Sequence, residues 1–223
     1  MIDISKLAKD GSFLSFDIEG DGNSGQRPVE LSFCQFNENG FVEEHYFLID
    51  PERPINTFAI SKHGLTDAMV QGRDTIRDVA ERIRELVSDQ MLVGHSSIDD
   101  VHLISTGIPD FLLLPKAILD TQRIARRLAK LRKETIPEAL SRFAVFNGID
   151  PHDAPASLAR RGLHSASTDA WLTGQVFRAA MPLLPDDYTS KKQYPEMLSV
   201  KVSDARRREI EDKLLEQAAS MKP

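Results

Sequence analysis

The sequence predicts an α/β domain built on a mixed β-sheet. Three apolar runs come first, separated by turns rich in Gly and Asn, which is typical of an antiparallel meander. After them, a short apolar run is flanked by amphipathic segments, which is typical of strands connected by helices that cover a sheet. The 223 residues are enough for one sizeable core, and no apolar run reaches the length of a transmembrane helix.

The opening strands are expected at residues 13 to 18, 30 to 36 and 41 to 49. The intervening stretches GDGNSGQRP and NENG contain the residues that favour turns between paired strands. A further strand is expected in MLVGH, residues 91 to 95, and its apolar character indicates burial in the middle of the sheet.

Helices are expected between and after these strands. Residues 74 to 90 place apolar side chains at helical spacing with charges between them, which predicts an amphipathic helix that crosses back over the sheet. A proline-bearing loop is expected between residue 105 and Asp120. The other expected helices are residues 97 to 105, DTQRIARRLAKLRKE from near Asp120, IPEALSRFAVF and STDAWLTGQVFRAAM.

The composition changes after Pro182, so we expect the main domain in residues 1–181 and a loop with a terminal helix in residues 182–223. That helix has a narrow apolar stripe, which would pack back onto the domain or dock to a protein partner or to a second copy in a homodimer. The sequence does not decide between these alternatives. The stripe consists of Ile210, Leu214, Leu215 and Ala218.

Composition also narrows the class of protein. A single cysteine, Cys34, excludes an internal disulfide, and the start of the chain lacks the apolar core of a secretory signal. We therefore expect a cytoplasmic protein with no membrane partner. The net charge of -6 argues against binding duplex nucleic acid through bulk positive potential, but it is compatible with a small nucleic-acid site.

The stretch FLSFDIEGDG places carboxylates at alternate positions, Asp17, Glu19 and Asp21, after an apolar run. In a strand, Asp17 and Glu19 share the face opposite to Leu14 and its apolar neighbours. Carboxylates held this close resist ionising unless a cation lies among them, and their oxygens are ligands for hard divalent ions. The alternative is a polar strand end that faces water.

Three histidines are each followed by an aspartate five positions later, and the first pair, His45 and Asp50, is given no role. His95 and Asp100, in GHSSIDD, follow the expected central strand, and His164 and Asp169, in HSASTDA, begin the last helix of the domain. An aspartate in the first turn is favoured at any helix N-terminus, so the spacing alone is a weak indication. Asp99 is an alternative to Asp100.

The order of these pieces resembles that of the DEDDh 3'-to-5' exonucleases, the DnaQ-like group on the ribonuclease H-like fold. The resemblance covers roughly residues 12 to 181 and includes KHGLTDAMV, LVGHSSIDD, DTQRIARRL and IPEALSRFAVFNGI. It implies a mixed five-stranded sheet flanked by helices. It also implies hydrolysis of phosphodiester bonds from the 3'-end of a single-stranded nucleic acid, with DNA slightly favoured over RNA, and release of nucleoside 5'-monophosphates. The alternative is a catalytically silent relative that binds nucleic acid or a polymerase.

The resemblance implies two Mg²⁺ or Mn²⁺ ions held by four carboxylates. Asp17 would bridge the two ions, Glu19 and Asp169 would complete the site of the attacking water, and Asp100 would support the second ion through water. His164 would act as the general base, because imidazole titrates near neutral pH.

Substrate binding is assigned to Gly20 and His95. The family commonly has threonines or a small apolar residue where this chain has Gly20 and Asp21, and Ser96 and Ser97 replace its usual Asn and Ala. The first of these departures, at Gly20 and Asp21, concerns the contact with the 3'-terminal nucleotide.

A basic helix face is a further candidate for contact with phosphates, although a solvated surface explains it equally well. Arg160 and Arg161, just before His164, are better placed by sequence. The basic face consists of Arg123, Arg126, Arg127 and Lys130.

Overall fold

The computed structural model describes residues 11–159, 164–185, 198–200, 208–210 and 212. Its centre is a five-stranded mixed sheet with the strand order β3-β2-β1-β4-β5. The first three strands form an antiparallel meander, and β4 and β5 run parallel to β1. The predicted α/β class is confirmed. The strands are β1 (Phe13–Gly20), β2 (Pro28–Asn37), β3 (Gly40–Leu48), β4 (Met91–Gly94) and β5 (Ala117–Asp120).

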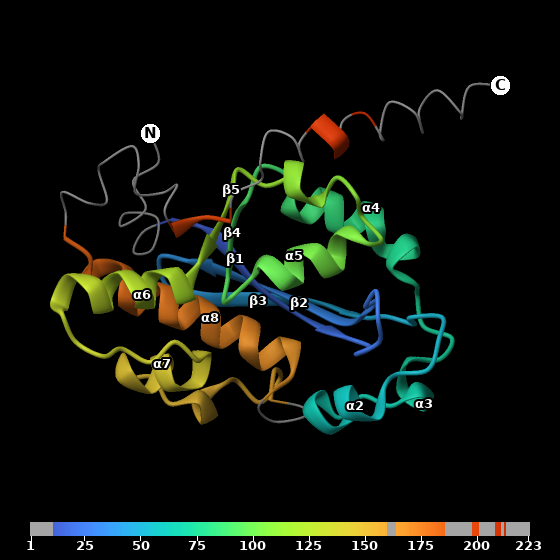
Figure 1. Cartoon of the computed structure of the whole chain (residues 1–223), viewed down its shortest axis with the longest axis horizontal. Coiled ribbons are helices and arrows are strands. Elements are labelled where there is room, and N and C mark those ends of the chain that lie inside the picture. Colours follow the sequence, from blue (N-terminus) through green and yellow to red (C-terminus); the bar gives the residue numbers. More distant parts are fainter. Residues whose placement is uncertain (1–10, 160–163, 186–197, 201–207, 211, 213–223) are drawn as a thin grey trace.

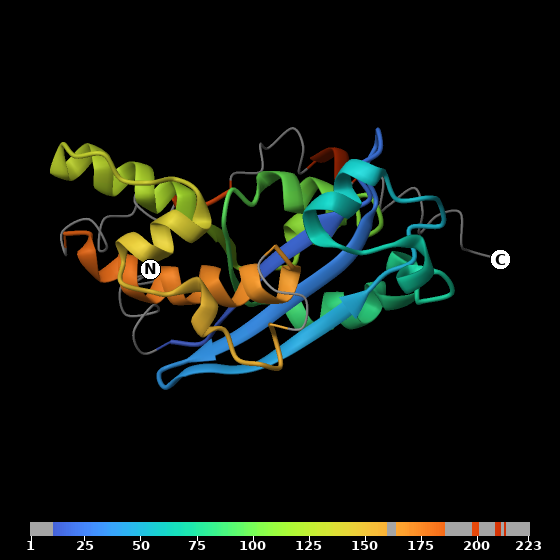
Figure 2. The same cartoon turned by 90° about the horizontal axis from the view of Figure 1, so that it is seen from below.

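Helices cover both faces of the sheet. The helices are α2 (Thr57–His63), α3 (Asp67–Val70), α4 (Ile76–Val87), α5 (Ile98–Ser105), α6 (Thr121–Arg132), α7 (Leu140–Phe146) and α8 (Ala166–Ala180). Short 3-10 turns lie at η1 (Phe111–Leu113), η2 (Pro151–Asp153) and η3 (Met181–Leu183). Figure 1 shows α4 and α5 on one face of the sheet and α6, α7 and α8 on the other, and Figure 2 shows α8 lying along the sheet.

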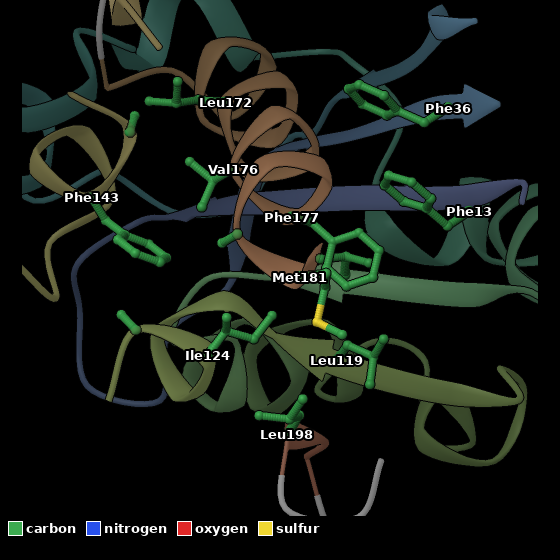
Figure 3. Packing of buried hydrophobic residues seen from close by; sticks show 14 of the residues in the cluster. Phe13, Phe36, Leu119, Ile124, Phe143, Leu172, Val176, Phe177, Met181 and Leu198 are labelled. Carbon is green, nitrogen blue, oxygen red and sulfur yellow. The ribbon is translucent and has the colours of Figure 1, made fainter. Parts of the chain in front are cut away.

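Helix α8 packs directly on the central strands. The rings of Phe177 in α8 and Phe13 in β1 meet edge to face with centroids 4.9 Å apart (Figure 3). A Cβ atom on Gly174 would lie 2.2 Å from the Phe36 ring in β2, so only glycine allows this close approach. The position of α8 relative to β1 is therefore set by buried aromatic packing.

Both faces of β1 are buried. The alternation predicted a core on the face of Leu14, Phe16 and Ile18, and these residues do pack against α4 and α5. That expectation is incomplete, because Phe13 and Ser15 on the other face are also buried, beneath α8. The carboxylates that follow them on this face are therefore held between a strand and a helix.

Several elements differ from the prediction. Strand β5 lies where a loop was expected, because four residues are too few to show a period. Helix α7 begins at Leu140 and not at Ile136, since Ile136 precedes a proline and is kept out of the helical conformation. Helices α2 and α3 were not predicted.

Little of the terminal extension is described. Residues 208–210 and 212 are helical, and Ile210 is buried. Leu214, Leu215 and Ala218 lie outside the described residues, as do Arg160 and Arg161. The boundary at residue 181 and the docking of the extension stay predictions. Within the described ranges, no helix has both the length and the apolar character needed to cross a bilayer.

Candidate active site

Three parallel strands end at the same edge of the sheet. Because β1, β4 and β5 run in the same direction, Gly20, Gly94 and Asp120 lie at one end of the molecule. In open α/β sheets this edge is where ligands commonly bind. Helices α5 and α6 begin directly after β4 and β5, so their first turns lie at this edge as well.

Three carboxylates come together there. Oxygens of Asp17, Glu19 and Asp169 all lie within 4.8 Å of one another. The first two lie on the face of β1 that α8 covers, and Asp169 lies in the first turn of α8. A register shift between Glu19 and Gly20 ends the regular pairing with β2, as β-bulges often do beside active sites. An all-oxygen donor set of this kind suits a hard divalent cation.

Asp100 lies close enough to affect this cluster electrostatically. Burial is the largest cause that raises the pKa of Asp17 well above its usual value, and the negative charges of Asp100, Asp169 and Glu19 raise it further. Burial, followed by the charges of Asp99, Asp120 and Asp169, raises the pKa of Asp100 to about 8.

The neighbouring Asp99 is exposed, whereas Asp100 is half-buried. Of these two alternatives, Asp100 is the one whose charge acts on the pKa of Asp17.

His164 stands at the rim of the cluster. It is exposed and has a φ of 64°, an uncommon backbone conformation for a residue other than glycine. Ser165, directly after it, begins α8 by accepting a hydrogen bond from the Thr168 N–H at 3.3 Å. Burial raises the pKa of Asp169 to about 6, and the positive charge of His164 opposes this rise.

Glu30 is a residue of this region that the prediction missed. It is fully buried and lies directly across from Glu19 in the β1–β2 pairing. Its Oε2 atom accepts a hydrogen bond from the Ala166 N–H at 3.0 Å, so it holds the first residue of α8. The available signal was its alternation with Ser32 and Cys34, which places it on the α8 face of β2.

Asp120 was also missed as part of the site. The residue is 4% exposed, and its carboxylate caps α6. It also accepts from the first residues of the loop that leads to Asp100, so one side chain fixes the start of two segments. The donors are the N–H groups of Ser96 (3.1 Å), Ser97 (3.2 Å), Gln122 (2.9 Å) and Arg123 (3.4 Å).

The two residues expected to contact substrate, His95 and Gly20, form hydrogen bonds with other groups of the protein. Nδ1 of His95 lies 2.7 Å from Thr121 Oγ1, and Nε2 lies 2.7 Å from the Glu138 carbonyl oxygen. The carbonyl oxygen of Gly20 accepts from Nε2 of the buried His63 at 3.3 Å. Substrate binding by His95 and Gly20 therefore stays a prediction.

Asp21 does not extend the carboxylate row on β1. Strand β1 ends at Gly20, and the buried Asp21 carboxylate forms an ion pair with Arg53. Burial by itself would raise the pKa of Asp21, but hydrogen bonds from Arg53 and from the N–H groups of Arg27 and Asn23 lower it. The alternation of carboxylates in the sequence therefore does not continue in space as far as Asp21, because the chain turns away from the strand before this residue.

A protein-family model described as exonuclease, RNase_T, matches residues 14–177. The chain belongs to this exonuclease family. The predicted resemblance to the DEDDh exonuclease superfamily is thereby confirmed. The match spans the sheet, α8 and the carboxylate cluster, so the cluster is part of the exonuclease domain.

DNA polymerase III chains are among the similar sequences. The chain is 31% identical over 124 residues to the PolC-type DNA polymerase III of Listeria welshimeri, which covers 54% of this chain and 9% of that protein. It is 24% identical over 157 residues to the DNA polymerase III subunit epsilon of Buchnera aphidicola, which covers 68% of this chain and 62% of that protein. The chain thus spans less than two thirds of the length of either relative.

Solved exonuclease structures share the fold. Exonuclease X in complex with 5' overhanging duplex DNA superposes with a TM-score of 0.65 at 22% identity, over 83% of this chain and 99% of that one. E. coli exonuclease I in complex with a dT13 oligonucleotide superposes with a TM-score of 0.65 at 18% identity, over 86% of this chain and 46% of that one. Family membership and the acidic cluster together support a nucleic-acid exonuclease that depends on a divalent metal.

Proposed function

We propose that this protein is a 3'-to-5' exonuclease that removes nucleoside 5'-monophosphates from the 3'-end of a single-stranded nucleic acid, with DNA favoured over RNA. The observation that carries the proposal is the convergence of Asp17, Glu19 and Asp169 within 4.8 Å. Carboxylates this close repel one another, so the arrangement is costly unless cations bind among them.

The proposed cofactors are two Mg²⁺ or Mn²⁺ ions, because carboxylate oxygens suit these ions better than zinc. Asp17, Glu19, Asp100 and Asp169 would hold them. Divalent ions bound there would polarise the scissile phosphodiester and lower the pKa of the attacking water.

His164 is the proposed general base. It lies directly before α8, the helix that holds Asp169, and its charge already acts on Asp169. It would take a proton from the water as the water attacks phosphorus. The bond from phosphorus to the 3'-oxygen of the penultimate nucleotide then breaks, and the terminal nucleotide leaves as a 5'-monophosphate.

The choice of DNA is supported by the relatives, which are DNA polymerase III chains, and by neighbours solved with DNA. The same relatives support a polymerase as a protein partner. Homodimer formation through residues 182–223 is a separate proposal, which a mass measurement in solution tests directly.

The experiment is digestion of a 5'-labelled single-stranded DNA and a matched RNA with Mn²⁺, Mg²⁺ or Ca²⁺. A 5'-label reports polarity, because trimming from the 3'-end produces a ladder of labelled products. We expect the ladder with Mn²⁺ and Mg²⁺ but not with Ca²⁺, and faster digestion of DNA. Asp17→Asn is expected to abolish it, and His164→Ala to slow it by about 10²–10⁴-fold, the usual contribution of a general base.

Asp100→Asn and Asp99→Asn form a matched pair in the same helical turn. We expect a large loss for the first and nearly normal activity for the second, since Asp99 is exposed. Immediate release of the label as a mononucleotide would overturn the 3'-to-5' polarity. Folded protein without any metal-dependent shortening would favour the silent, nucleic-acid-binding relative.

A further inference from the structure

The outer side of α6 carries a basic groove outside the carboxylate cluster. The groove has a volume of about 370 Å³ and is called here the α6 groove. It is lined by Arg123, Arg126, Arg127, Lys130 and Leu198. Helix α6 contains five cationic side chains and no acidic one, in a protein whose net charge is -6. The α6 groove is therefore positively charged although the protein as a whole is negatively charged.

The groove is built on fixed structure. Leu198 is 1% exposed and belongs to the same core cluster as Ile124 on the inner face of α6 (Figure 3). Arg123 Nη1 donates to the Ser199 carbonyl oxygen at 2.7 Å, which ties the helix to the short segment that pairs with β5. The backbone on both sides of the groove is thus anchored in the core, and the cationic side chains project from it.

The groove starts at the edge of the sheet where the carboxylates lie. Asp120 caps α6 and also binds the N–H groups of Ser96 and Ser97, which begin the loop to Asp100. Arg123 lies in the first turn of α6, and the helix then runs away from this edge on the side of the sheet that α8 covers (Figure 1). A nucleic-acid strand whose 3'-end lies at the carboxylates could therefore continue along α6.

We propose that the α6 groove binds the phosphodiester backbone of the nucleic-acid substrate behind its 3'-end. The direction of the strand rests on the proposed exonuclease function. From Arg123 to Lys130 the helix rises about 10 Å, at about 1.5 Å per residue. That length matches about three nucleotides at about 3.4 Å each. Arg and Lys contacts to phosphate fix position without reading bases, so the groove favours longer strands and no particular sequence.

The test compares two double variants with the same change in charge. Arg126→Gln with Lys130→Gln removes two exposed groove cations, and the Arg126 ion pair with Glu138 that is lost is itself largely exposed. Arg77→Gln with Arg82→Gln is the control on α4, on the opposite face of the sheet. Fluorescence anisotropy in Ca²⁺ measures the affinity for single strands of about four and about 20 nucleotides at several salt concentrations, lengths that fall short of and exceed the groove.

The groove variant is expected to bind the longer strand about tenfold more weakly at low salt. Its plot of log affinity against log salt should be shallower by about 1.4, because each lost single-strand phosphate contact removes about 0.7. The ratio of affinities for long and short strands should fall only in this variant. Unchanged binding of the longer strand, or an equal loss in the α4 control, would overturn the proposal.

These readouts do not need turnover. Groove-dependent binding by a protein that hydrolyses nothing would overturn the exonuclease proposal alone. Active enzyme with unchanged long-strand affinity in the groove variant would overturn the groove alone.

Discussion

Asp100 occupies the first turn of α5, where the helix dipole ordinarily keeps a carboxylate ionised. Here burial and three neighbouring carboxylates outweigh the dipole, and they raise the pKa of Asp100 to about 8. Asp169 occupies the corresponding place in α8, and its pKa is raised to about 6. Without bound cations, the folded protein therefore retains protons that the unfolded chain gives up.

This shift predicts how pH affects the metal-free protein. The folded-state pKa of Asp100 lies above its ordinary value of 3.8. Its contribution to the free energy of unfolding is therefore most favourable below pH 3.8 and is lost as pH rises toward about 8. Asp100→Asn cannot ionise, so its melting temperature in EDTA should increasingly exceed that of the wild type between about pH 5 and about pH 8. The gap should widen by several degrees, since such a pKa difference corresponds to at most about 1.4 kcal/mol per pH unit and each kcal/mol to about 2–4 °C.

Glu85→Gln on the exposed side of α4 is the control, and its melting temperature should follow the wild type across this pH range. If the melting temperatures of wild type and Asp100→Asn changed in parallel with pH, the raised pKa of Asp100 would be contradicted.

At the scale of elements, the site depends on how helices begin. Asp120 satisfies backbone donors of both α6 and the loop before α5, and Glu30 does the same for α8. Each caps or holds a segment that carries a carboxylate or leads to one. Helix starts have N–H groups without intrahelical partners, so buried acceptors at these points fix both the position and the direction of the helix.

Asp120→Ala should therefore affect both stability and metal binding. We expect the free energy of unfolding to fall by about 3 kcal/mol, because a cap is lost and buried N–H groups lose their acceptor. Mn²⁺ affinity should fall at least about tenfold, as is usual when groups that orient metal ligands are removed. Denaturant unfolding and calorimetric titration measure the two effects.

Thr75→Ala removes the cap of α4, which is remote from the carboxylates. It should cost about 1 kcal/mol and leave the Mn²⁺ affinity intact. Equal Mn²⁺ affinities in Asp120→Ala and Thr75→Ala would show that Asp120 does not position Asp100.

At the scale of the whole molecule, one sheet carries a core on both faces, and the carboxylates lie where β1 and α8 meet. Asp17 and Glu19 come from β1, and Asp169 comes from the helix packed over it. The cluster therefore exists only while α8 lies on the sheet. Any cation bound there is bound to the folded state.

Metal binding should consequently stabilise the whole fold. At Mn²⁺ about 100-fold above its dissociation constant, the free energy of unfolding should rise by about 2.7 kcal/mol. Urea unfolding followed by circular dichroism and by the fluorescence of the single tryptophan, Trp171 in α8, should show the same shift with both probes. Asp17→Asn is expected to lose the Mn²⁺-dependent shift, and retention of the full shift would place the ion elsewhere.

The sequence by itself determined the features that depend on near neighbours. Apolar runs separated by turns identified three strands, alternation put Asp17 and Glu19 on one face, and helical spacing identified α4. Such patterns follow from backbone geometry, which repeats every two residues in a strand and every 3.6 in a helix.

Only the tertiary structure decided the remainder. It shows that Asp21 pairs with Arg53, that Glu30 holds the start of α8, that β5 joins the sheet and that Asp100 rather than Asp99 acts on the pKa of Asp17. These contacts join residues far apart in the chain. Strand order and close packing of α8 on β1 determine them, and neither is written in a local pattern.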